Sequence, residues 1–274
     1  PVPDAAYDLV NAWARARSWD ERRSVLDAQA TDIPHPALEW LGVLTIVYPD
    51  DPGLSELHSI VAAAEQQGLQ LVLDDLAARA ALSETIGEWL TTPTWDRDFA
   101  YLRAHTDVLT SAEARGLLQQ AIDPVSPDPD LVQHLAILDL VQVLGQDHID
   151  EIEQLVTHPT RAAERALTAL DAGDTALAGL IVSANPRTLQ VPGRGPFILA
   201  LLLAAAGQRD AALEAAQAAA AAGTRTERRA RSIYLAKYRA VRAAAHPAVA
   251  ADDGILDALA AILDKVDPET GRTD

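Results

Sequence analysis

The chain has 274 residues, of which 49% are hydrophobic and 23% are charged, and its formal net charge is −18. These proportions exclude an intrinsically disordered chain, and the absence of cysteine excludes disulfides, a thiolate nucleophile and a zinc–thiolate site. The excess of acidic residues makes nucleic acid and anionic membrane surfaces unfavourable partners.

The apolar residues are mostly alanine, leucine and valine, and only 4% of the chain is aromatic, which favours packed helices over sheets. In chain order, Asp4 and Asp20 are predicted to cap the first two helices, the second over residues 21–29. Two prolines close together predict a loop at residues 31–36, and Pro36 suits the first position of a third helix. Two further helices are expected over residues 55–67 and 69–81.

The pair Trp19-Asp20 occurs again as Trp95-Asp96, and its neighbours recur at the same separation. The further matched pairs are Trp13 and Trp89, Leu26 and Leu102, Ala28 and Ala104, and His58 and His134. Four of the five tryptophans fall into this register, so chance is a poor explanation. An internal repeat of this length is typical of stacked helical units, and we expect its tryptophans to pack between helices.

The first repeat unit is expected over about residues 5–80 and the second over about residues 83–145. In the second unit, Asp96 and Ser111 are predicted to cap helices. Closely spaced prolines predict a loop at residues 123–130. The two units therefore share one order of helices and turns.

After Asp147 the pattern changes to pairs of helices joined by short glycine turns, repeated after roughly thirty residues, as in tetratricopeptide helix pairs. The helices expected from residue 131 onward span residues 131–144, 162–171, 176–183, 197–206, 211–222, 227–245 and 255–266. We therefore predict an all-α fold, a right-handed superhelical array of antiparallel helix pairs (a tetratricopeptide-like α-solenoid). Its predicted domains are residues 1–146, the duplicated Trp-Asp repeat, and residues 147–274, the tetratricopeptide-like pairs.

Residues 88–96 (Glu-Trp-Leu-Thr-Thr-Pro-Thr-Trp-Asp) are followed by residues 102–105 (Leu-Arg-Ala-His) and by residues 108–114 (Val-Leu-Thr-Ser-Ala-Glu-Ala). This order of motifs resembles the helical-repeat region of large bacterial proteins, which often lies beside a caspase-like CHAT peptidase domain. The resemblance covers residues 83–145 and, as a degenerate copy, residues 5–70. It implies a recognition or regulatory role. The caspase-like nucleophile is a cysteine, which this chain lacks, so peptidase activity does not carry over.

Sequence motifs for catalysis or metal binding are missing, since the chain has no HExxH, paired ExxH or GxSxG pattern. His58 and His134 also lack an acid at helical spacing, because Asp139 follows His134 by five positions. The glycine-rich segment 192–196 has no strand before it and is predicted to be a connector instead of a phosphate loop. We therefore predict no catalytic residue, no metal and no cofactor.

The most distinct charge pattern lies between residues 225 and 242, where seven cations stand against one acid, Glu227. The candidate binding residues are Arg225, Arg228, Arg229, Arg231, Lys237, Tyr238, Arg239 and Arg242. Such a helix predicts contact with an acidic peptide, a phosphate group or an acidic partner surface. The alternative, favoured by the surplus of acids in the chain, is that these cations pair with acidic neighbours inside the same array.

The function predicted from these features is that of a non-enzymatic protein- or peptide-binding module with a regulatory or scaffold role. One alternative is a helical enzyme or small-molecule-binding protein whose buried pocket is lined by histidines and tyrosines. Another is a purely structural domain of a larger chain. Residues 1–7 lack the charged segment and apolar core of a signal peptide, so a cytoplasmic location is expected.

Overall fold

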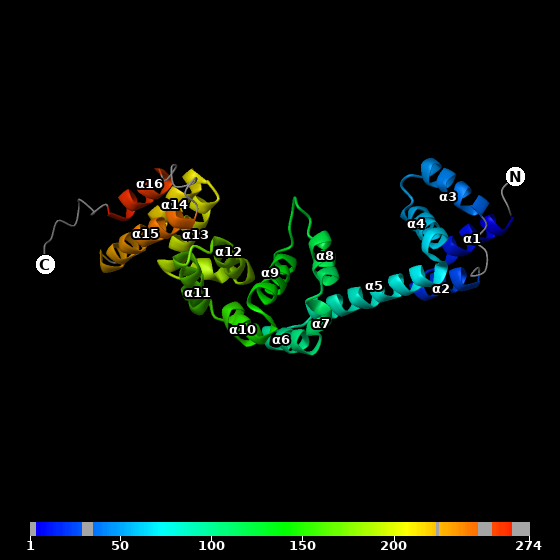
Figure 1. Cartoon of the computed structure of the whole chain (residues 1–274), viewed down its shortest axis with the longest axis horizontal. Helices are drawn as coiled ribbons and strands as arrows, with labels where there is room; N and C mark the ends of the chain where they lie inside the picture. Colours follow the sequence, from blue (N-terminus) through cyan, green and yellow to red (C-terminus); the bar gives the residue numbers. More distant parts are fainter. Residues whose placement is uncertain (1–3, 29–34, 223–224, 246–253, 265–274) are drawn as a thin grey trace. The chain divides into compact units, whose positions relative to one another are not determined.

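The computed structural model describes residues 4–28, 35–222, 225–245 and 254–264. All regular structure in these ranges is helical and comprises sixteen α-helices and two short 3-10 helices (Figure 1). The all-α prediction is therefore confirmed for this part of the chain. None of the helices in these ranges combines the length and the apolar character needed to cross a membrane.

Contacts between residues divide the chain into two compact units, residues 1–84 and residues 85–274. The division falls within α5 (Leu69–Leu90), so the beginning of this helix belongs to the first unit and its end to the second. In the sequence, the division lies two residues into the second expected repeat unit.

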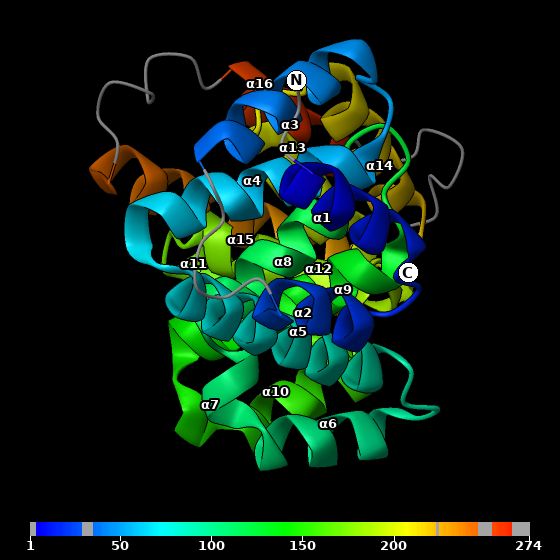
Figure 2. The same ribbon diagram turned by 90° about the vertical axis from the view of Figure 1, so that its right-hand side faces the viewer.

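The first unit contains α1 (Asp4–Arg15), α2 (Trp19–Ala28), α3 (His35–Val47), α4 (Pro52–Gln67) and the beginning of α5. Helix α1 contacts α2, α3 and α4, and α1, α3 and α4 lie together in both views (Figure 1, Figure 2). Apolar side chains from every helix form the core: Leu9, Trp13, Leu26, Leu41, Leu57, Ile60, Val61, Val72 and Leu73. Trp13 thus packs between helices, as predicted.

The second unit continues from the end of α5. Its α-helices are α6 (Trp95–Ala104), α7 (Thr106–Leu109), α8 (Ala112–Ala121), α9 (Pro129–Leu144), α10 (Ile149–Thr157), α11 (Pro159–Asp171), α12 (Thr175–Ala184), α13 (Arg194–Ala205), α14 (Arg209–Ala221), α15 (Arg225–Ala245) and α16 (Gly254–Asp264). Two 3-10 helices, η1 (Gln146–His148) and η2 (Pro186–Gln190), connect them. Helix α11 contacts α10, α12, α13 and α15 (Figure 1). Because α9 contacts both α10 and α12, these contacts continue across the predicted domain division at residues 146–147.

Alanine fills the helix interfaces of the second unit. The buried alanines of α11 and α14 are Ala162, Ala163, Ala166, Ala169, Ala212, Ala215, Ala216 and Ala219. Small side chains let helix axes approach closely, because the distance between axes depends on the side chains at the contact. The alanine-rich composition that predicts packed helices is therefore explained by these interfaces.

The helices at the two Trp–Asp pairs begin at the tryptophan and not after the aspartate. The Ser18 hydroxyl accepts a hydrogen bond from the Glu21 N–H at 3.2 Å, so Ser18 caps α2. Thr94 occupies the same position before α6 but makes no side-chain cap. The prediction that Asp20 and Asp96 cap these helices is wrong, because both lie inside the first turn and not before it. A negative charge in the first turn nevertheless stabilises the helix through its dipole.

Helices α4 and α9 have the same length and the same types of residue at their two ends. Each has 16 residues, follows an aspartate cap (Asp51 or Asp128), begins with proline and ends at a glycine of positive φ. His58 is the seventh residue of α4, whereas His134 is the sixth residue of α9. Successive residues of a helix point in directions about 100° apart. The two histidines, although matched in the sequence repeat, therefore point to different sides of their helices.

Candidate functional site

The predicted basic helix is α15, which packs against α11 and α16. The side chains of four of its candidates lie outside the described residues: Arg225, Arg228, Arg229 and Arg242. Arg231 and Tyr238 are buried with Leu235, because these three positions share the face of α15 that packs against the unit. Arg231 also donates to the main-chain carbonyl of Ala219 in α14. Neither side chain belongs to an exposed surface, which corrects the prediction for these two residues.

The other two described candidates pair with acids of the second unit. Lys237 Nζ contacts the carboxylate of Asp171 in α11, and Arg239 Nη2 lies 2.7 Å from Asp257 Oδ1 in α16. These contacts correspond to the alternative in which cations of this helix pair inside the array. A binding role for the four arginines without described side chains stays a prediction.

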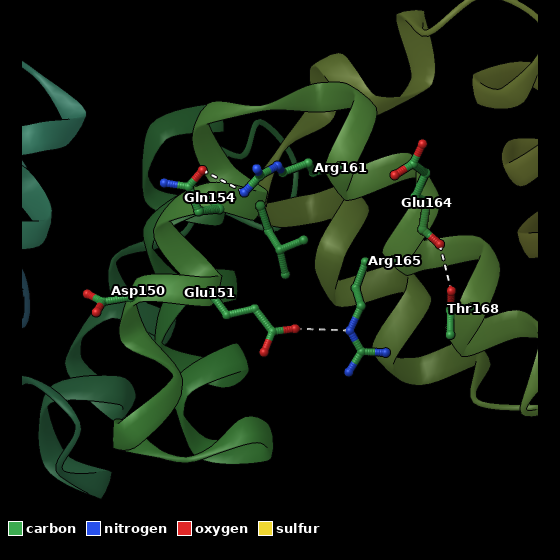
Figure 3. Close-up of a pocket in the computed structure, with 8 residues that line it drawn as sticks. Asp150, Glu151, Gln154, Arg161, Glu164, Arg165 and Thr168 are labelled. Carbon is green, nitrogen blue, oxygen red and sulfur yellow. Dashed lines mark hydrogen bonds and ion pairs between the residues drawn. The ribbon is translucent and has the colours of Figure 1, made fainter.

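An open groove of about 570 Å³ lies between α10 and α11 (Figure 3). Its lining residues come from both helices: Asp150, Glu151, Gln154, Leu155, Arg161, Glu164, Arg165 and Thr168. Figure 3 shows Glu151 of α10 and Arg165 of α11 meeting across the groove. Five of these side chains carry a charge, so electrostatics decides what the groove can bind.

Glu151 contacts Arg165 and His148 at the groove. Its Oε1 accepts a hydrogen bond from Arg165 Nε at 3.2 Å, and its Oε2 lies 3.0 Å from Nδ1 of His148. Burial raises the pKa of Glu151, but the hydrogen bonds from His148 and Arg165 outweigh burial and hold this pKa below its usual value. Glu151 is therefore ionised and already neutralised by its neighbours at neutral pH.

The other two carboxylates of the groove pair with arginines from other helices. Arg194 of α13 lies 2.8 Å from Glu164, and Arg103 of α6 lies 2.6 Å from Asp150. Exposed pairs of this kind contribute little to stability, but they reduce the negative potential of the groove. Every carboxylate in the lining consequently has a cationic partner.

Arg161 is the exception among the charged side chains of the groove. Its Nη1 donates to Oε1 of Gln154 at 3.0 Å, and Gln154 is a neutral amide. Within the part of the chain that the structure describes, Arg161 takes part in no ion pair. Among the described residues, the groove thus keeps one exposed guanidinium that forms no ion pair, in a chain of net charge −18. An incoming carboxylate can form a charge-assisted, bidentate contact with such a group.

Sequence reasoning missed this groove because it expected no helix over residues 149–157 and placed the start of the next helix at residue 162, beyond Arg161. Pro159 occupies the first position of α11 and so begins the helix earlier. Arg161 and Arg165 then lie one turn apart on the same face. The signal that could have found them was the proline itself, which is favoured at the first position of a helix.

A second polar cluster lies buried in the second unit and joins α5, α6 and α9. Asp98 Oδ1 accepts a hydrogen bond from Trp89 Nε1 at 2.6 Å, and Oδ2 accepts one from Thr92 Oγ1 at 3.1 Å. Oδ2 also lies 2.9 Å from His134 Nε2. Asp98 is only 3% exposed and His134 only 6%, so a substrate cannot reach them. This geometry fits a structural role and does not fit general acid–base catalysis.

The two neighbours of His134 favour its charged, imidazolium form. Its Nδ1 lies 2.7 Å from the Asp130 carbonyl oxygen, and its Nε2 faces the Asp98 carboxylate. A carbonyl and an ionised carboxylate are both acceptors, so they favour a proton on each ring nitrogen. Burial lowers the pKa of His134, but the hydrogen bonds to Asp98 and Asp130 outweigh burial and place this pKa above its ordinary value of 6.5.

The raised pKa of His134 predicts that the second unit loses stability as the pH rises. A group whose pKa is higher in the folded protein stabilises it fully below the unfolded pKa, about 6.5, and this stabilisation is lost as the pH rises through the folded pKa. In an NMR titration of the histidine ring protons, the signal that disappears in His134→Gln should have its midpoint above 6.5. A midpoint at or below 6.5 would contradict the imidazolium assignment.

Sequence reasoning missed Asp98 because it searched for acids within the helix of His134, whereas this partner comes from α6. The first unit has a different arrangement at the matching position, which is Arg22. Arg22 Nη1 lies 2.6 Å from Glu56 Oε2, and its guanidinium lies 5.1 Å from the centre of the Trp13 ring. The tryptophans of the two units therefore occupy matching sequence positions, but the polar side chains around them make different contacts.

Within the residues that the structure describes, no three His, Asp or Glu side chains converge in a way that could hold a metal ion. Comparison of the chain with models of protein families, with curated proteins and with solved structures finds no match. The groove between α10 and α11 and its charges are therefore the features from which a function can be inferred.

Proposed function

We propose that this chain is a non-enzymatic protein- or peptide-binding module, with a regulatory or scaffold role, that receives an acidic segment of a partner in the α10–α11 groove. The observation that carries the proposal is that, among the described residues, Arg161 forms no ion pair in a groove whose carboxylates are all paired. A partner carboxylate can replace Gln154 as the acceptor for Arg161. The guanidinium then faces an ionised acceptor in place of a neutral amide, and the contact can become bidentate.

The form of the groove favours an extended segment. Its volume of about 570 Å³ lies within the usual range of ligand sites, and the groove is open instead of enclosed. The amide of Gln154 and the hydroxyl of Thr168 can form hydrogen bonds with a peptide backbone. Leu155 supplies an apolar contact among the charged side chains. These features suit a peptide better than a compact apolar ligand.

The resemblance to tetratricopeptide helix pairs extends the proposal to the arrangement of the helices and to the location of the protein. We propose a right-handed superhelical array of antiparallel helix pairs that acts in the cytoplasm. The arginines of α15 without described side chains are proposed as a further contact for the same acidic partner: Arg225, Arg228, Arg229 and Arg242. The alternative of a small-molecule pocket lined by histidines and tyrosines finds less support, because His134 and Tyr238 are buried in packed contacts.

Peptides selected from a random display library on the full chain should be rich in aspartate or glutamate. Counter-selection on the Arg161→Glu, Arg165→Glu double variant removes binders that do not use the groove. A selected peptide should bind Arg161→Glu at least about ten-fold more weakly, because a hydrogen bond to a charged group contributes about 1.5–3 kcal/mol. Fluorescence anisotropy of the labelled peptide measures the Kd.

Arg187→Glu is the matched control, since Arg187 is an exposed arginine of η2 and its reversal changes the net charge equally. The selected peptide should bind this variant as it binds the wild type. Equal weakening by both reversals would mean that the peptide is attracted by overall charge, and the groove would then not be the binding site.

A further inference from the structure

The outer face of α3 in the first unit is apolar and exposed. Val43, Ile46 and Val47 are 54%, 79% and 58% exposed, and their spacing places them on one side of the helix. The opposite side of α3 carries the buried Leu41 and packs against α4. Glu39 is the only charged residue of this helix. A helix that is apolar on both sides has a second face to bury.

Aromatic residues extend this apolar surface onto α1. The ring of Trp40, which is half-buried, lies 6.3 Å from the ring of the exposed Tyr7. The exposed Tyr48 directly follows α3. Single exposed apolar side chains are ordinary, but a contiguous group on one helix and its neighbour is typical of an interaction surface.

Two acidic residues stand at the ends of the outer face. Glu39 precedes Val43 by one helical turn, and Asp50 follows in the turn after α3. Both are exposed, and neither takes part in an ion pair among the described residues. Residues 1–84 carry 14 acidic and 5 basic residues, a net charge of −9 with neutral histidine. The apolar stripe is therefore bordered by two carboxylates that form no ion pair with the described part of the chain.

We infer that the outer face of α3, defined as Val43, Ile46 and Val47, is a docking surface for an amphipathic helix of a partner protein. The partner helix carries an aliphatic stripe with lysine or arginine at both ends, so that its cations meet Glu39 and Asp50. This surface lies in the first unit and does not depend on the α10–α11 groove.

Charge argues against a second copy of the chain as the occupant. In an antiparallel pair of α3 helices, Glu39 of one copy would face the Asp50 end of the other, and the reverse contact would repeat the conflict. Like charges placed opposite each other disfavour that pairing. The same acids disfavour an anionic lipid surface. A partner helix with an aliphatic stripe and basic ends complements both the apolar side chains of the outer face and the acids Glu39 and Asp50 at its ends.

Two synthetic helical peptides with the same leucine stripe, one with arginine and one with glutamate at both ends, test the inference on the full chain. Fluorescence anisotropy should show the arginine-ended peptide binding at least ten-fold more tightly. Ile46→Asn should weaken its binding at least ten-fold, and Glu39→Gln should weaken it several-fold. Val125→Asn is the matched control, because Val125 is an exposed valine of the second unit. It should bind the peptide as the wild type does.

Three results would overturn the inference. One is equal binding of the arginine-ended peptide to the wild type and to Ile46→Asn, which would mean attraction by net charge alone. Another is a dimer in sedimentation analysis that Ile46→Asn dissociates, which would make a second copy the occupant. The third is co-sedimentation with neutral phosphatidylcholine vesicles that Ile46→Asn abolishes. Circular dichroism of each variant should match the wild type, because the substituted side chains are exposed.

Discussion

Replacing Asp98 with alanine is expected to lower the free energy of unfolding of the second unit by about 3–5 kcal/mol. Asp98 is buried and accepts hydrogen bonds from Trp89, Thr92 and His134. Without the carboxylate, the Trp89 N–H and the charged ring of His134 lose their acceptor in a place that water cannot reach. An unpaired buried charge is among the few causes of so large a loss.

The matched control for this substitution is Asp96→Ala in the same helix. Asp96 is exposed in the first turn of α6, where its charge contributes about 0.3–1 kcal/mol through the helix dipole. Hydrogen exchange of peptides from α6 and α9 under increasing urea reports the second unit separately from the first. Similar losses for Asp96→Ala and Asp98→Ala would show that the buried cluster does not hold these helices together.

Replacing Gly195 with alanine is expected to destabilise the second unit by about 3 kcal/mol. A Cβ atom at this position would lie 2.2 Å from the carbonyl oxygen of Leu189, which is a main-chain atom. Because a main-chain atom cannot rotate away, α13 or η2 has to shift. Gly195 lies in the first turn of α13, and its N–H donates to the Val191 carbonyl at 2.8 Å.

Gly179→Ala in α12 is the comparison for Gly195→Ala. A Cβ atom at Gly179 would meet no atom within 4 Å, and alanine favours a helix interior by about 0.5–1 kcal/mol over glycine. Urea unfolding should therefore show a gain for Gly179→Ala and a loss for Gly195→Ala. If both substitutions shift stability in the same direction, the close approach of Gly195 to Leu189 is not present in solution.

The helices could be predicted from the sequence wherever the signal is local. Ser111 caps α8 by accepting a hydrogen bond from the Ala114 N–H at 3.1 Å, as expected from its place before an apolar run. The cap of α2 was misplaced because Ser18 and Asp20 are both good caps, and local preference alone does not separate them. The all-α fold follows from many such local signals together with the alanine-rich composition.

The polar sites could be predicted less well, because their partners are distant in the sequence. Asp98 follows Trp95 on the apolar face of α6. An acidic residue on an apolar helix face indicates a buried carboxylate, and this was the sign in the sequence that His134 has a partner outside its own helix. Arg231 belongs to a dense run of cations, yet it points to a main-chain carbonyl of α14. Charge patterning reports how many cations a helix carries but not which of them face the core.

We propose that an acidic segment binds between α10 and α11 through Arg161. The most direct measurement is photo-crosslinking of a display-selected acidic peptide to the full chain, with the linked residues located by mass spectrometry. We expect links confined to α10 and α11 that disappear with Arg161→Glu and persist with Arg187→Glu. Links elsewhere in the chain, or links that survive Arg161→Glu, would contradict it.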